Sequence, residues 1–123
     1  MLGSSITLTV NGVAKAMNLI NQDNYSGEYL LQEATEEWRL KVSHAKMAAN
    51  RVTGVVYNRH VADFTHTTYA VAGVSPEVYN RVYTTWIQKD GDSVSTNYIS
   101  SALSTYLTAS SGAKTVAILG WES

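Results

Sequence analysis

Apolar and polar residues alternate along much of the chain before Lys89, which is the period-two pattern of half-buried β-strands. The alternation is clean in residues 6–10, and Asn11-Gly12 follows it. This dipeptide is the strongest signal for a two-residue hairpin turn, because both turn residues need a positive φ. We therefore predict an N-terminal β-hairpin within residues 1–20.

Alternation continues over residues 28–87, where short gaps between the strands favour an antiparallel sheet. The expected strands are 28–33, 38–44, 51–64 and 78–87. In the second of them, Arg39, Lys41 and Ser43 share one parity and the apolar residues share the other. A loop is expected from residue 69 to 76.

The pattern changes to a helical period after a break that ends at Asp92. Asp92 or Ser93 can accept hydrogen bonds from the first free N–H groups of a helix, and Gly112 is suited to end it. Residues 115–119 are apolar and short, and they fit either a second helix or a strand. Strands followed by a helical region, here residues 93–123, indicate an α+β fold. The apolar stripe of the first helix consists of Val94, Tyr98, Ala102, Leu103, Tyr106 and Leu107.

The composition is typical of one folded domain over residues 1–123, since 45% of the residues are hydrophobic. Cysteine is absent, which excludes disulfides, thiolate zinc sites and thiol nucleophiles. Neither a signal peptide nor a membrane span is recognisable, so we expect no membrane partner. The formal net charge of −1 argues, on average, against a protein that coats nucleic acid.

The charge is nevertheless unevenly distributed. Residues 38–62 contain five of the nine basic residues and no acidic one. Farther along, Arg81 shares its parity with Tyr79 and Tyr83. Basic side chains bind phosphates and aromatic rings stack on unpaired bases, so this pattern fits a face for single-stranded or looped RNA. An ordinary solvated sheet face or a protein contact surface fits it as well.

Residues suited to catalysis or metal binding are sparse. His44, His60 and His66 are not grouped with carboxylates at metal-ligand spacing. The sequence contains no nucleophile elbow, phosphate-binding loop or dinucleotide fingerprint. We therefore expect no enzymatic activity, no metal and no cofactor.

The order and spacing of these elements resemble the coat proteins of single-stranded RNA bacteriophages (leviviruses) along essentially the whole chain. The resemblance rests on four segments: the Asn11-Gly12 hairpin, the basic hairpin from Trp38 to Arg51, the Ser75-Pro76 loop before residues 78–83, and the run from Asp92 to Leu107. It implies an N-terminal hairpin, a five-stranded antiparallel sheet and two C-terminal helices. It also implies an interlocked homodimer in which the apolar stripe forms the interface. From the stripe alone, a helix packed on its own sheet remains an alternative.

The same resemblance implies a viral capsid protein that assembles in the bacterial host cytoplasm into an icosahedral virion shell. The inward sheet face would package single-stranded genomic RNA and bind an RNA stem-loop that represses translation. The implied RNA-binding residues are Arg39, Lys41, Ser43, Tyr57, Arg59, Tyr79, Arg81 and Tyr83. A one-residue shift of the strand over 51–64 would replace Tyr57 and Arg59 by Val56 and Asn58. The loop over 69–76 would lie at the shell's symmetry axes and, without cysteines, make non-covalent contacts. A dimeric RNA- or ligand-binding module that never assembles is the alternative.

Overall fold

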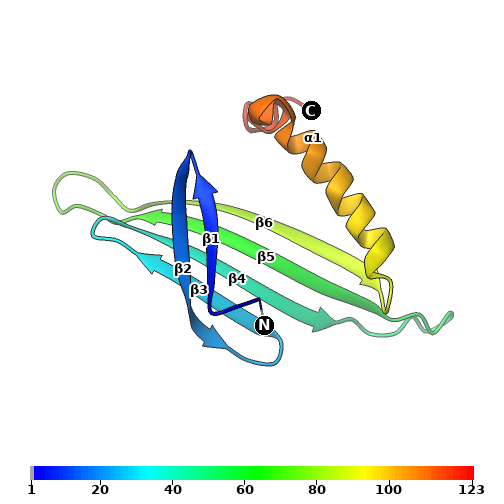
Figure 1. The fold of residues 1–123 in the computed structure, drawn as a ribbon. Coiled ribbons are helices and arrows are strands. Elements are labelled where there is room, and N and C mark those ends of the chain that lie inside the picture. Colours follow the sequence, from blue (N-terminus) through cyan, green and yellow to red (C-terminus); the bar gives the residue numbers. More distant parts are fainter. Residues whose placement is uncertain (1) are drawn as a thin grey trace.

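The structure is a computed structural model that describes residues 2–123 as a curled, six-stranded antiparallel sheet and one helical element (Figure 1). This arrangement confirms the predicted α+β class. The strands follow one another in the sheet in chain order, so each pairs with its neighbours in sequence. The elements are β1 (Ser5–Val10), β2 (Val13–Gln22), β3 (Ser26–Gln32), β4 (Glu36–Lys46), β5 (Tyr57–Thr68), β6 (Val78–Lys89) and α1 (Ser93–Leu119).

The N-terminal hairpin is present, with Asn11 and Gly12 at φ values of 49° and 79° in its turn. The separate five-stranded sheet implied by the resemblance is wrong, because β2 continues to Gln22 and pairs with β3. Hairpin and sheet thereby become one layer of six strands. The loop between β2 and β3 is short because the Asp23 carboxylate accepts hydrogen bonds from the N–H groups of Tyr25 and Ser26.

The predicted strand over 51–64 begins too early, since β5 starts at Tyr57 and runs on to Thr68. The cause is a turn that periodicity does not reveal. The Asn50 side chain accepts hydrogen bonds from the N–H groups of Val52 and Thr53, and it holds this segment out of the sheet. As a result Val52, which resembles a strand residue in the sequence, is 94% exposed.

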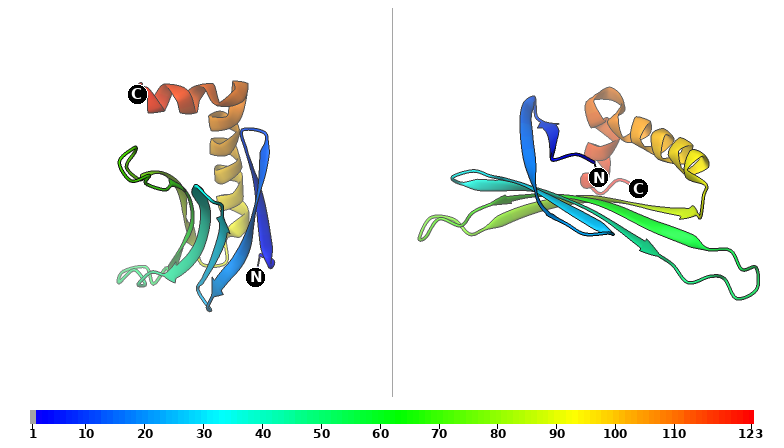
Figure 2. Two further views of the ribbon diagram at one scale, coloured as in Figure 1. Left: turned by 90° about the vertical axis from the view of Figure 1, so that its left-hand side faces the viewer. Right: turned by 60° about the horizontal axis from the view of Figure 1, so that its bottom comes forward.

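The two predicted helices are one element, α1, with a sharp bend (Figure 2). The Asp92 side chain caps its start by accepting from the N–H of Ser95. Residues 109–112 leave helical geometry, and Ser110, Ser111 and Gly112 have φ values of 51°, 58° and 82°. Gly112 therefore lies in the bend, where the first helical segment of α1 has ended. Residues 115–119, for which the sequence left a second helix or a strand open, are helical.

The hydrophobic core lies on one face of β1–β5. Among the described residues, the buried apolar ones are Met17, Tyr29, Trp38 and Leu40, with Phe64 and several aliphatic residues packed around them. The hairpin of β1 and β2 curls over this face, so its apolar residues cover Trp38 and Leu40. α1 lies over the same side, where the indole N–H of Trp86 donates to the Ser100 hydroxyl at 2.8 Å. The opposite face of β4–β6 is left uncovered.

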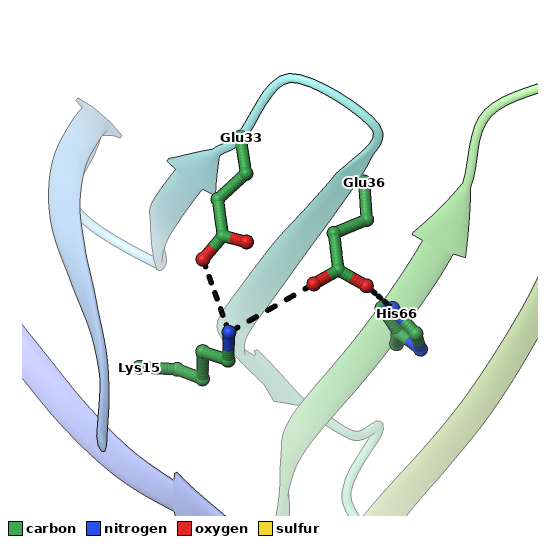
Figure 3. Close-up of polar contacts among 4 residues, drawn as sticks. All are labelled: Lys15, Glu33, Glu36 and His66. Carbon is green, nitrogen blue, oxygen red and sulfur yellow. Dashed lines mark hydrogen bonds and ion pairs between the residues drawn. The ribbon is translucent and has the colours of Figure 1, made fainter. Parts of the chain in front are cut away.

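A polar network closes the edge of this core (Figure 3). The ammonium of Lys15 on β2 lies 3.1 Å from the Glu33 carboxylate and 3.8 Å from that of Glu36 on β4. The other Glu36 oxygen lies 2.6 Å from Nε2 of His66 on β5. The His66 ring stacks on Trp38 at 3.8 Å between centroids. The network thus ties the hairpin to the middle of the sheet over the largest core side chain.

Glu36→Gln tests this network through its pH dependence. The hydrogen bond from His66 lowers the pKa of Glu36 below its ordinary 4.5. A carboxyl with a depressed folded pKa stabilises the fold above its unfolded pKa, and this contribution disappears as the pH falls through the folded pKa. We expect the stability gap between the native protein and Glu36→Gln to be present at pH 4.5 and to shrink as the pH falls below that value. Urea unfolding from neutral pH down to about pH 3 measures this gap.

Glu77→Gln is the matched control, because Glu77 is exposed and makes no ion pair within residues 2–123. Its stability gap should stay small at every pH. A Glu36→Gln gap that does not change with pH would contradict a stabilising role of the ionised carboxylate.

Candidate nucleic-acid interface

The strand register places all eight predicted RNA-binding residues on one face of the sheet. Residues directly opposite each other in an antiparallel pair share a face. Three rows run across β4, β5 and β6 in this way: Arg39–Thr65–Arg81, Lys41–Asp63–Tyr83 and Ser43–Val61–Thr85. We call this surface the basic face, defined by Arg39, Lys41, Ser43, Tyr57, Arg59, Tyr79, Arg81 and Tyr83. The RNA-binding role of these residues remains a prediction.

The same register shows which residues of β5 lie on the basic face. Arg59 lies opposite Ala45 and Ile87, on the basic face, and Tyr57 lies opposite Lys89. Asn58 is on the other face, where its amide donates to Asp90 at 2.9 Å. Lys89, which reasoning from the sequence missed, also belongs to the basic face. The alternation of β6 beyond Tyr83 was the signal that could have found it.

Three carboxylates, all from outside the acid-free window of the sequence, also lie on the basic face. Glu28 on β3 and Glu37 on β4 both pair with Arg39, the latter at 3.1 Å. These pairs raise the pKa of the Arg39 guanidinium above its already high ordinary value. Asp63 on β5 pairs with Arg81. The net positive charge of the basic face is therefore smaller than the sequence suggested, and two acidic neighbours hold Arg39.

Lys41 and Arg59 differ from Arg39 in this respect. Within residues 2–123, no carboxylate lies within ion-pair distance of either side chain. Both residues are exposed. Lys89 is likewise exposed and has no such carboxylate within this range, so these three cations of the basic face are best placed to contact an incoming phosphate.

Aromatic side chains add a flat apolar surface along β6. Tyr79 and Tyr83 are 62% and 61% exposed, and Tyr57 on the neighbouring strand is also exposed. The Arg81 guanidinium carbon lies 5.0 Å from the Tyr83 ring centroid. Cations and exposed rings on one uncovered face can together hold phosphates and stack on unpaired bases.

The predicted interface stripe on α1 is mostly solvent-exposed within the single chain. α1 contains no buried residue in the described range. Tyr98 is 71% exposed, and Val94, Ala102, Leu103 and Tyr106 are exposed too, while Leu107 is half-buried. On the neighbouring β6, Val78 and Val82 lie on the same sheet face as α1 and are exposed. This placement is open for an interface, whereas a helix packed along its own sheet would have buried the stripe.

Residues 2–123 contain no group of three or more His, Cys, Asp or Glu residues arranged to hold a metal ion. Their one helix does not combine the length and apolar character needed to cross a membrane.

Comparison with protein families now identifies the class: this is a phage coat protein, a structural component of a virion. Residues 3–89 match the family described as the phage phiCb5 coat protein. The match covers more than half of the chain, and the chain belongs to this family. It includes all six strands and ends where β6 ends. A search of curated proteins finds no match. The predicted resemblance is thus confirmed at the level of a phage coat protein.

Proposed function

We propose that this coat protein packages single-stranded genomic RNA on its basic face, with the face turned toward the inside of an icosahedral shell, as in the levivirus coat proteins it resembles. One observation carries the proposal: cations and exposed tyrosines gather on a sheet face that no other described element covers. Five cations, with Lys89, and three carboxylates give each chain about +2 on this face. Every copy in a shell repeats that charge toward the genome.

The proposal includes a homodimer as the building block. β6 is the last strand of the sheet, so one row of its backbone N–H and C=O groups is unpaired in the single chain. Beside this edge lie the exposed apolar residues of β6 and α1. A second copy that pairs its own β6 antiparallel to this one, and lays its α1 over this sheet, would satisfy the edge and bury both apolar surfaces. Such copies would interlock.

The exposed tyrosines extend the proposal to an RNA stem-loop, because unpaired loop bases can stack on rings whereas paired bases cannot. Binding such a stem-loop in the messenger would block translation, which fits the repressor role of the coat proteins it resembles. We place assembly in the cytoplasm of the bacterial host, where genomic RNA is present. The membership in a coat-protein family favours this account over a dimeric RNA- or ligand-binding module that never assembles.

Expression of the chain alone in bacteria tests the packaging proposal. We expect uniform spherical particles by electron microscopy, with nuclease-protected host RNA recovered from purified particles. Empty particles would contradict RNA packaging while leaving the coat function intact. Dimers alone, at every concentration and with RNA added, would favour the non-assembling module.

Lys41→Ala and Arg39→Ala, two residues apart on β4, form a matched pair that tests the basic face. Each loses one positive charge. We expect Lys41→Ala to reduce the slope of log affinity against log salt by about 0.7, the value for one phosphate contact with single-stranded nucleic acid. Arg39→Ala should change that slope much less, because Glu28 and Glu37 already hold Arg39.

Fluorescence anisotropy titrations at several salt concentrations measure both slopes. Arg39→Ala should instead lower the midpoint of urea unfolding, since two half-buried carboxylates lose their partner. Equal slope losses in the two variants would show that Arg39 releases its carboxylates to bind phosphate.

A further inference from the structure

Asp63 is a carboxylate in the centre of a face that we propose binds a polyanion. It lies directly opposite Lys41 on one side and Tyr83 on the other. A negative charge here weakens the attraction for phosphate, so its presence calls for a physical reason. Its side chain is only 18% exposed, against 49% for Arg81. The carboxylate is thus set into the sheet surface beneath the guanidinium.

Both oxygens of Asp63 are engaged by Arg81. Nε of Arg81 lies 2.9 Å from Oδ1 and 3.0 Å from Oδ2, and one terminal nitrogen lies 2.6 Å from Oδ2. Paired contacts of this kind fix the plane of a guanidinium as well as its position. They also raise the pKa of Arg81 above its ordinary value. Arg81 is therefore held in one orientation instead of swinging freely from an edge strand.

That orientation brings Arg81 onto an aromatic ring. Its guanidinium carbon is 5.0 Å from the Tyr83 ring centroid, within the range of a cation–π contact. Tyr79 lies on the other side of Arg81 along the same face of β6. Arg39 offers a contrast on the same face. It also has carboxylate partners, but no aromatic ring lies within cation–π distance of it in the described residues.

We propose that Asp63 is a positioning residue that makes this coat protein select RNA with unpaired bases. The inference rests on the proposed RNA-binding function of the basic face. By holding Arg81 on Tyr83, Asp63 builds a stacked pair whose flat surface receives an unpaired base. An Arg81 without this partner would contact any phosphate and so favour every polyanion alike. Asp63 thereby lowers the affinity for polyanions in general and raises the preference for RNA with unpaired bases.

Asp63→Asn tests the inference with three ligands of similar charge: a single-stranded oligoribonucleotide of about 12 nucleotides, the same ribose–phosphate chain without bases, and a blunt RNA duplex. Anisotropy titrations of the full-length protein give the ratio of affinities for the single strand and the abasic chain. We expect Asp63→Asn to lower this ratio about fivefold to tenfold, the effect of losing one base-stacking contact. Affinity for the abasic chain should hold or rise.

Two further variants keep the test sharp. Glu28→Gln removes one negative charge from the same face but touches no arginine–tyrosine pair, so it should leave the ratio within about twofold of the native value. Arg81→Lys keeps the positive charge but loses the planar guanidinium, so we expect it to lower the affinity ratio about as much as Asp63→Asn does. This variant tests the inference independently if Asp63→Asn fails to fold.

The outcomes distinguish a failure of this inference from a failure of the proposed RNA-binding function. If Asp63→Asn and Glu28→Gln raise binding of the single strand and the abasic chain equally, Asp63 is only a repulsive charge and the inference is wrong. It is also wrong if the native protein binds the duplex as tightly as the single strand. If the native protein binds none of the three ligands, the proposed RNA-binding function fails together with the inference.

Discussion

The apolar surface of β6 and α1 has no partner within residues 2–123, and the rest of the architecture depends on how that surface is covered. The core lies under the N-terminal half, where the hairpin curls over Trp38 and Leu40. The C-terminal third leaves an open strand edge, and Val82 and Leu103 are among the large apolar side chains that stay exposed there. Exposed apolar surface of this extent beside an unpaired strand is a feature of a subunit rather than of a free-standing domain. Membership of a coat-protein family agrees with this interpretation of the exposed apolar surface.

The period-two geometry of the strands separates two roles within one layer. One face carries the core residues and α1, and the other carries the cations and tyrosines. Because side chains alternate strictly, a one-residue slip in β5 would turn Arg59 toward the core and bring Asn58 to the basic face. The long, unbroken pairing of β4 with β5 and of β5 with β6 holds this register. The network at Lys15 and Glu36 secures the same layer at its hairpin end.

Local patterns predicted much of this fold because they act over a few residues. The Asn11-Gly12 turn, the Asp92 cap and the parity of Arg39 and Lys41 follow from spacing alone. The start of β5 did not, because the Asn50 side chain stabilises a turn where periodicity indicated a strand.

The ion pairs of the basic face could not be predicted from the sequence either. Glu28 and Asp63 reach their arginines across strands, eleven and eighteen positions away. The acid-free window of residues 38–62 could not show that Arg39 pairs with Glu28 on the adjacent strand. Nor could the sequence show that Arg81, which lies outside this window, pairs with Asp63. The bend in α1 likewise rests on positive φ values at two serines, which residue type does not favour.

Hydrogen–deuterium exchange of the β6 backbone amides in the full-length protein tests the central claim most directly. If a second copy covers the β6 edge and α1, amides along β6 should exchange as slowly as those of β5, and α1 should be protected up to its bend. Exchange along β6 and α1 as fast as in the loop over residues 69–77, while β4 and β5 stay protected, would contradict the account. The edge would then be open in solution, and the exposed apolar surface would need another explanation.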